Sequence, residues 1–186
     1  LIELLKILDL QNFLKINESG NLKEIFSMIF PEFLYLNRLD RLNKVYEQSE
    51  LNRDILLAVL LIDGKDNHEY FLHKYKTSNK IIEMLKKFNK NLIEIKNDKD
   101  YFENDLAKKI YFNGKKYFIA LNLINFSINA KVKTYDFSKT LNKILKTKVP
   151  TFPIDGELLK EKGMEEGQTL GNVLKKLEKE WVNNNF

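Results

Sequence analysis

Hydrophobic residues recur in this chain at intervals of three and four positions, which is the spacing of one face of an α-helix. The clearest example is an apolar stripe close to the C-terminus, formed by Leu170, Val173, Leu174, Leu177 and Trp181. No segment shows the strict alternation typical of a half-buried strand. The pattern predicts an all-α fold, an irregular multi-helix bundle that ends in a glycine-hinged helical hairpin.

Upstream of that hairpin, the same spacing predicts a series of short helices. They cover residues 1–10, 21–28, 55–62, 68–75, 79–88, 101–112, 117–130 and 137–145. Several polar residues just before these segments can act as N-caps, since their side chains accept hydrogen bonds from the first helical N–H groups. The candidate caps are Asn21, Ser49 or Asn52, Ser78, and Asp136 or Thr134.

Two segments of the body are less regular. Residues 92–95 are compatible with a helix or an extended segment, and residues 96–100 read as a charged loop. Between residues 34 and 46, one helical face is predicted to be apolar and the opposite face basic. The apolar face contains Leu34, Leu39, Leu42, Val45 and Tyr46, and the basic face contains Arg38, Arg41 and Lys44.

The terminal hairpin has strong local signals. Asp155 is a good N-cap for a helix over 156–162, and Gly163 can take the positive φ that ends a helix. Gly167 can cap the second helix. Gly171 lies inside the first turn of that helix, where glycine costs about 1 kcal/mol of helix propensity. We therefore expect a neighbouring helix or a phosphate to approach the backbone at Gly171.

This hairpin resembles the C-terminal tail of bacterial class II tRNA nucleotidyltransferases, the CCA-adding enzymes and related poly(A) polymerases. The matching positions are Gly167, Leu170, Gly171, Leu174, Leu177 and Trp181. Gln168 stands where the family usually has proline, a mild departure because proline at that position only pre-sets the helix. Weaker likeness at residues 3–8, 25–32 and 76–79 extends the resemblance over nearly the whole chain.

The resemblance implies an organisation in three parts. Residues 1–95 correspond to the end of the neck and the body helices, 96–148 to a second helical group of the body, and 149–186 to the tail hairpin. The chain starts in a helical pattern without methionine, so we expect it to be a piece of a longer protein. The family's catalytic head, which binds Mg²⁺ and CTP or ATP, would lie outside this piece.

In that case the chain alone has no catalytic residues, no metal site and no cofactor, although the full-length protein would be an enzyme. Its expected partners are tRNA and the head and neck of the same protein, in the cytoplasm and without a membrane. The longest apolar segment, around 117–128, is interrupted by Asn122 and Asn125 and is too short to cross a bilayer.

The charge balance is compatible with RNA binding. Lys and Arg total 31 against 26 acidic residues, giving a formal charge of +5. Lysine dominates, and its abundance together with Asn and Ile is also what an AT-rich genome would encode. The candidate RNA contacts are Lys160, Lys162, Gly163, Gly167, Gly171, Lys175, Lys176 and Lys179. Glu165 and Glu166 would oppose a phosphate at the turn, so a hairpin that only docks on the body is the alternative.

Other chemistry has little support in the sequence. There are no cysteines, and Asp98 and Asp100 have the spacing of a metal-binding pair. They lack a third carboxylate and the upstream Gly-Ser that the resembled family has at its catalytic site. His68 and His73 are interpreted as surface or packing histidines. A metal phosphohydrolase, a third possible function, would therefore lack its metal ligands. The aromatic residues Phe112, Tyr117, Phe118 and Phe126 are expected in the core, and Trp181 in the packed stripe. An all-helical protein-interaction domain with no RNA role is the alternative function.

Overall fold

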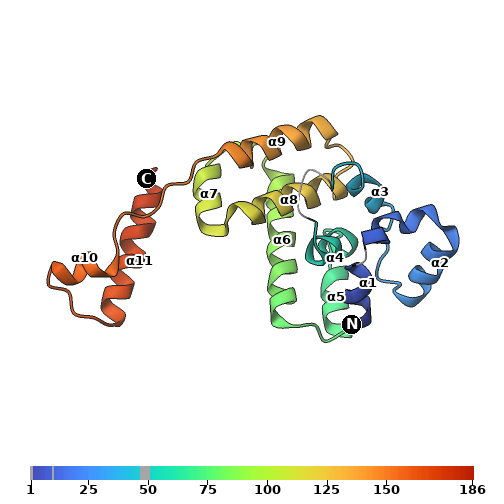
Figure 1. Ribbon diagram of the computed structural model, residues 1–186, viewed down its shortest axis with the longest axis horizontal. Coiled ribbons are helices and arrows are strands. Elements are labelled where there is room, and N and C mark those ends of the chain that lie inside the picture. Colours follow the sequence, from blue (N-terminus) through green and yellow to red (C-terminus); the bar gives the residue numbers. More distant parts are fainter. Residues whose placement is uncertain (1, 10, 47–50) are drawn as a thin grey trace.

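The computed structural model describes residues 2–9, 11–46 and 51–186, and all regular structure in these ranges is helical (Figure 1). This confirms the predicted all-α class. The elements are α1 (Ile2–Leu8), the 3₁₀ helix η1 (Gln11–Glu18), α2 (Gly20–Ile29), α3 (Arg38–Leu42), α4 (Arg53–Leu61), α5 (Asn67–Lys74), α6 (Asn79–Asn97), α7 (Leu106–Asn113), α8 (Lys115–Ile128), α9 (Thr134–Lys146), α10 (Gly156–Glu161) and α11 (Gln168–Asn183).

Two helices with almost no exposed side form the centre of the body. In α4 every residue from Ile55 to Leu61 is buried, and in α8 the buried run extends from Leu121 to Ser127. The α8 helix contacts α3, α4, α6, α7 and α9, so the body is assembled around it. The start of α4 is fixed by Asn52, whose Oδ1 accepts a hydrogen bond of 3.1 Å from the N–H of Ile55. The other candidate cap, Ser49, lies outside the described residues.

The two arginines of α3 are half-buried and bind backbone carbonyls, whereas Lys44 of the same predicted basic face is exposed. Arg38 donates to the carbonyls of Val59 (2.8 Å) and Ile62 (2.7 Å), at the end of α4. Arg41 donates to Phe126 O and, at 2.7 Å, to Val132 O, beyond the end of α8. The last carbonyls of a helix have no partner within it, and a guanidinium with five N–H donors can bind several at once.

The α3 region also differs in its length. The helix covers only five residues, and turns precede and follow it. Leu39, Leu42 and Val45 are buried as predicted, but Leu34 lies before the helix and is 64% exposed. The apolar spacing was therefore right for the second half of the segment and wrong for its start.

Several predicted helix limits need correction. The ambiguous segment 92–95 belongs to α6, which continues to Asn97, so the loop begins only at Asp98. The cap of α2 is Ser19 rather than Asn21, and α7 begins at Leu106 after a run of turns rather than at residue 101. At α9, Lys133 precedes the helix and Asp136 accepts a hydrogen bond from its N–H at 3.1 Å.

The aromatic predictions are correct except for one residue. Phe118 and Phe126 are each 1% exposed, and Tyr117 is half-buried with its ring stacked on Phe88, at 5.0 Å between centroids. Phe112 is 58% exposed and does not belong to the core. No helix within the described ranges has both the length and the apolar character needed to cross a membrane.

Candidate nucleic-acid interface

The tail hairpin of α10 and α11 is set apart from the body at one end of the molecule, after the connecting segment 147–155 (Figure 1). Asp155 starts α10 as predicted, because its Oδ1 accepts a hydrogen bond of 3.0 Å from Leu158 N–H. Gly163 follows the helix with φ +89°, and Met164 N–H donates to Leu159 O at 3.1 Å. Positive φ with such a back-directed bond is the usual glycine termination of a helix.

The close approach within the hairpin occurs at Gly156, not at Gly171. A Cβ added to Gly156 would lie 3.6 Å from Leu170 Cδ2 and 3.9 Å from Leu174 Cδ1, so α11 packs against the start of α10 there. At Gly171 nothing lies within 4 Å of the same position. The expectation that a neighbouring helix contacts the backbone at Gly171 is therefore wrong, because the space around this residue is open.

The end of α11 is joined to the body through aromatic rings. The Trp181 ring lies 5.4 Å from Phe152 and 5.8 Å from Tyr111 of α7, measured between centroids. The Tyr111 hydroxyl donates a hydrogen bond to the Glu178 carboxylate, and this bond raises the pKa of Tyr111 to about 12. Lys108 Nζ donates to Asn183 O at 3.2 Å. The tail is thus held to α7 at the end distant from its glycine turn.

Most of the candidate lysines are accessible. Lys175, Lys176 and Lys179 are exposed on α11, and Lys162 is exposed at the end of α10. Their side of α11 is distinct from the stripe of Leu170, Val173, Leu174, Leu177 and Trp181, whose members are buried or half-buried. The helix therefore presents an apolar side to the hairpin and the body and a lysine side to solvent.

Lys160 differs from the other candidates because it is engaged within the hairpin. Its Nζ lies 3.2 Å from both the Glu166 and the Glu157 carboxylates, and its side chain is 34% exposed. The hydrogen bond to Glu166 is the main reason that the pKa of Lys160 is raised. Glu166, expected to repel a phosphate, is thereby paired across the turn, while Glu165 is exposed.

A second basic region lies beside the connection between the body and the tail, and it was not among the predicted sites. A pocket of about 800 Å³ is lined by Tyr111, Gly114, Lys115, Lys146 and Lys148, among others. The N-terminus of α8 lies at this pocket, and it has no side-chain cap and no acidic residue in its first turn. Exposed N–H groups at a helix start favour anions. Lys115 belongs to a segment more than 30 positions before Lys146 and Lys148, so spacing alone could not group them.

The remaining polar candidates do not form a catalytic group. Within the described residues there is no cluster of three His, Cys, Asp or Glu side chains that could hold a metal ion. Asp98 Oδ1 accepts a hydrogen bond of 2.9 Å from Asp100 N–H, which makes this pair part of a turn. His73 is exposed on α5, whereas His68 is buried between α5 and α6.

Comparison with known proteins adds no relative. No protein-family model, no curated protein and no solved structure matches this chain. The expected resemblance to class II tRNA nucleotidyltransferases therefore stays a prediction from the sequence. Function has to be argued from the residues already named and from the geometry around them.

Proposed function

We propose that this chain is the tRNA-binding body and tail of a CCA-adding tRNA nucleotidyltransferase. It would hold the acceptor–TΨC arm of tRNA while the head of the same protein adds nucleotides to the 3′ end. The chain supplies no catalytic group in this proposal. Its contribution is to position the RNA, which requires a shaped, basic surface rather than reactive side chains.

The proposal depends on one observation: α11 has an apolar side and a lysine side. The apolar side packs on α10 and on the aromatic rings near α7, and Lys175, Lys176 and Lys179 lie exposed on the other side. A double-helical RNA arm is recognised mainly through its shape and its phosphates, because side chains cannot read its deep, narrow major groove. Exposed lysines on a rigid helix suit that task.

The basic pocket beside the connection between the body and the tail supports the same function. It is lined by Lys115, Lys146 and Lys148 together with the open N-terminus of α8. Tyr111 lines this pocket and also contacts Trp181 of the tail. The pocket therefore adjoins the place where the tail meets the body, and an RNA backbone following the tail could continue into it.

The proposal is tested by measuring the affinity for tRNA at several salt concentrations. The intact chain should bind with a steep salt dependence, since each phosphate contact adds roughly one to the slope of log K against log salt. Replacing Lys175, Lys176 and Lys179 with glutamate should weaken binding by at least about tenfold at low salt and reduce that slope. The three residues are exposed, so the variant should fold normally.

A control variant with the same change in net charge separates a local interface from general attraction. Lys23, Lys65 and Lys131 are also exposed but lie outside the tail, on α2 and in two connecting segments of the body. Their replacement with glutamate should change affinity much less than the α11 variant does. Equal losses in both variants, or tRNA binding without salt dependence, would contradict the proposal.

A protein-interaction domain without an RNA role is the alternative function. The observation that favours it is the outer side of α2, where four large apolar side chains are more than half exposed. They are Leu22, Ile25, Met28 and Ile29, at 57%, 53%, 76% and 59%. Exposed apolar groups gathered on one helix are typical of protein contacts. Absence of tRNA binding by the intact chain would favour this alternative.

A further inference from the structure

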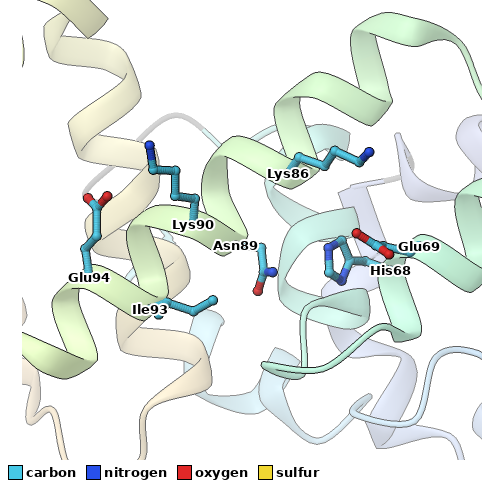
Figure 2. A pocket seen from close by; sticks show the side chains of 7 residues that line it. All are labelled: His68, Glu69, Lys86, Asn89, Lys90, Ile93 and Glu94. Carbon is cyan, nitrogen blue, oxygen red and sulfur yellow. The ribbon is translucent and has the colours of Figure 1, made fainter.

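A pocket between α5 and α6, on the body rather than the tail, has features of a ligand site. Its volume is about 460 Å³, and it is lined by His68 and Glu69 of α5 and by residues of α6 (Figure 2). The α6 residues are spaced so that Lys86 and Lys90 are four apart, as are Asn89 and Ile93. Residues four apart lie on one face of a helix, so α6 presents two parallel rows to the pocket.

The floor of this pocket contains polar atoms without partners. His68 is 1% exposed, and neither of its ring nitrogens has a hydrogen-bond partner among the described residues. The same holds for Oδ1 of Asn89, which is also buried. Figure 2 shows both side chains directed into the space between the two helices. Buried polar groups normally have partners, so an unpaired set in a pocket points to a bound group.

The protonation of His68 defines what the floor offers. Burial is the main influence on this imidazole and lowers its pKa, while Glu69, Asp63 and Asp66 act in the opposite direction and Lys86 lowers it further. A neutral imidazole has one N–H donor and one nitrogen acceptor. The Asn89 oxygen adds a second acceptor. The floor can therefore bind a planar group whose edge carries both hydrogen-bond donors and acceptors.

The rim of the pocket is charged. Lys86 and Lys90 are exposed on α6, and no ion pair is found for either within the described ranges. Glu94 accepts a hydrogen bond of 2.9 Å from Asn91 and is therefore occupied in part by its own helix. Glu69 also lines the pocket and is exposed, so its carboxylate disfavours an anion on the α5 side. The rim thus offers the two ammonium groups to an anion on the α6 side of the pocket, above the neutral floor.

We propose that this pocket binds a nucleotide, with the edge of the base on His68 and Asn89 and the phosphate at Lys86 and Lys90. A nucleotide combines a neutral donor–acceptor edge with an attached anion, which is the combination that floor and rim require. The choice of a nucleotide over another small molecule with these groups rests on the proposed RNA-binding function. The base can come from a free mononucleotide or from an unpaired nucleotide of an RNA strand.

The test uses the intact chain and nucleoside monophosphates, with AMP, CMP, GMP and UMP compared by calorimetry. NMR of the two histidine rings provides the local readout, because His73 is exposed and lines no part of this pocket. Binding should shift the ring signals of His68 and leave those of His73 unchanged. A short single-stranded oligonucleotide is titrated in parallel to distinguish the two sources of the base.

Variants then assign the contacts. His68→Leu should fold and lose the binding, and Lys86→Ala with Lys90→Ala should weaken it by about tenfold or more, since hydrogen bonds to charged groups have that order of effect. Lys80→Ala with Lys96→Ala is the matched control, because these lysines are exposed on the same helix outside the pocket. The control should change affinity less than about twofold.

The outcomes decide the proposal separately from the tail. Binding of the mononucleotides or of the oligonucleotide, with a His68 shift, supports it and identifies the source. Binding of inorganic phosphate or ribose 5-phosphate as tight as that of AMP would overturn it, as would no binding at millimolar concentration. The α11 glutamate variant should still bind the mononucleotide. If that variant loses tRNA but keeps AMP, the pocket and the tail interface are shown to be independent.

Discussion

The ring of Trp181 packs at a steep angle against the ring of Tyr111, with 5.8 Å between their centroids and 67° between their planes. This contact joins the last turns of α11 to α7, and Phe152 and Phe186 complete the aromatic group. The glycine turn at the opposite end of the hairpin lies beyond these contacts. The direction in which the tail extends from the body therefore depends on a few rings at one end.

Replacement of Trp181 with alanine should release the tail from α7. We expect the tail to lose about 1–2 kcal/mol of local stability, less than for a fully buried tryptophan because the ring is half-buried. Hydrogen exchange measured by mass spectrometry should show faster exchange in residues 168–183 and unchanged exchange in α4 and α8. Phe112→Ala is the control, since this exposed ring on the same α7 should cost less than about 0.5 kcal/mol. Equal protection in both variants would contradict the role of Trp181.

Arg41 should be one of the most sensitive positions of the body. Its guanidinium donates to the carbonyls of Phe126, Asn129 and Val132, so Arg41→Met would leave these acceptors without the partner they now have. We expect a loss of about 2–4 kcal/mol in the free energy of unfolding, measured by urea denaturation. Arg53→Met, at an exposed arginine 3.4 Å from Asp9, should cost under about 1 kcal/mol. Similar midpoints for both variants would be the contrary result.

The two tail glycines should respond to alanine in opposite directions. Gly171→Ala should stabilise α11 by about 0.5–1 kcal/mol, because glycine is a poor helix former and the added methyl meets open space. Gly163→Ala should destabilise the hairpin by about 1 kcal/mol, because φ is +89° there. Protection from hydrogen exchange in residues 156–183 measures both. If Gly171→Ala also leaves tRNA affinity unchanged, no phosphate approaches the backbone at that residue.

The pH dependence of stability should report the burial of His68. Burial lowers its pKa below 6.5 in the folded chain, so protonation favours the unfolded state. Stability should therefore be complete above pH 6.5 and decrease as the pH falls from 6.5 toward the lowered pKa. His68→Leu should remove this part of the decrease, measured by urea denaturation between about pH 7 and pH 5.5. An unchanged slope in His68→Leu would refute the assignment.

Local signals explain which parts of the fold could be predicted. The end of α10 at Gly163 and the cap at Asp155 depend only on neighbouring residues, and both were read correctly from the sequence. The continuation of α6 through residues 92–95 was ambiguous because it depends on contacts from elsewhere. Within α6, Asn91 Oδ1 accepts a hydrogen bond of 2.6 Å from the hydroxyl of Tyr117, which lies on α8.

The parts that could not be predicted involve residues distant in sequence. The pattern assigned Arg38 and Arg41 to a basic face but could not show their partners, which are backbone carbonyls and leave no trace in side-chain patterns. The candidate pockets are also formed by residues that are distant in sequence. His68 and Asn89 are brought together only by the packing of α5 on α6, so the sequence could identify the histidine but not its unpaired state.

The bonds made by Arg41 also have a consequence for the order of events during synthesis. The carbonyls that this guanidinium binds are contributed by residues 85 to 91 positions later in the chain. When α3 leaves the ribosome, these carbonyls have not yet been synthesised. The Arg41 guanidinium therefore lacks these hydrogen-bond partners until α8 and the following turn emerge. The contacts of α3 with η1 and α4 need no later segment, so Arg41 is the part of α3 whose bonding is completed last.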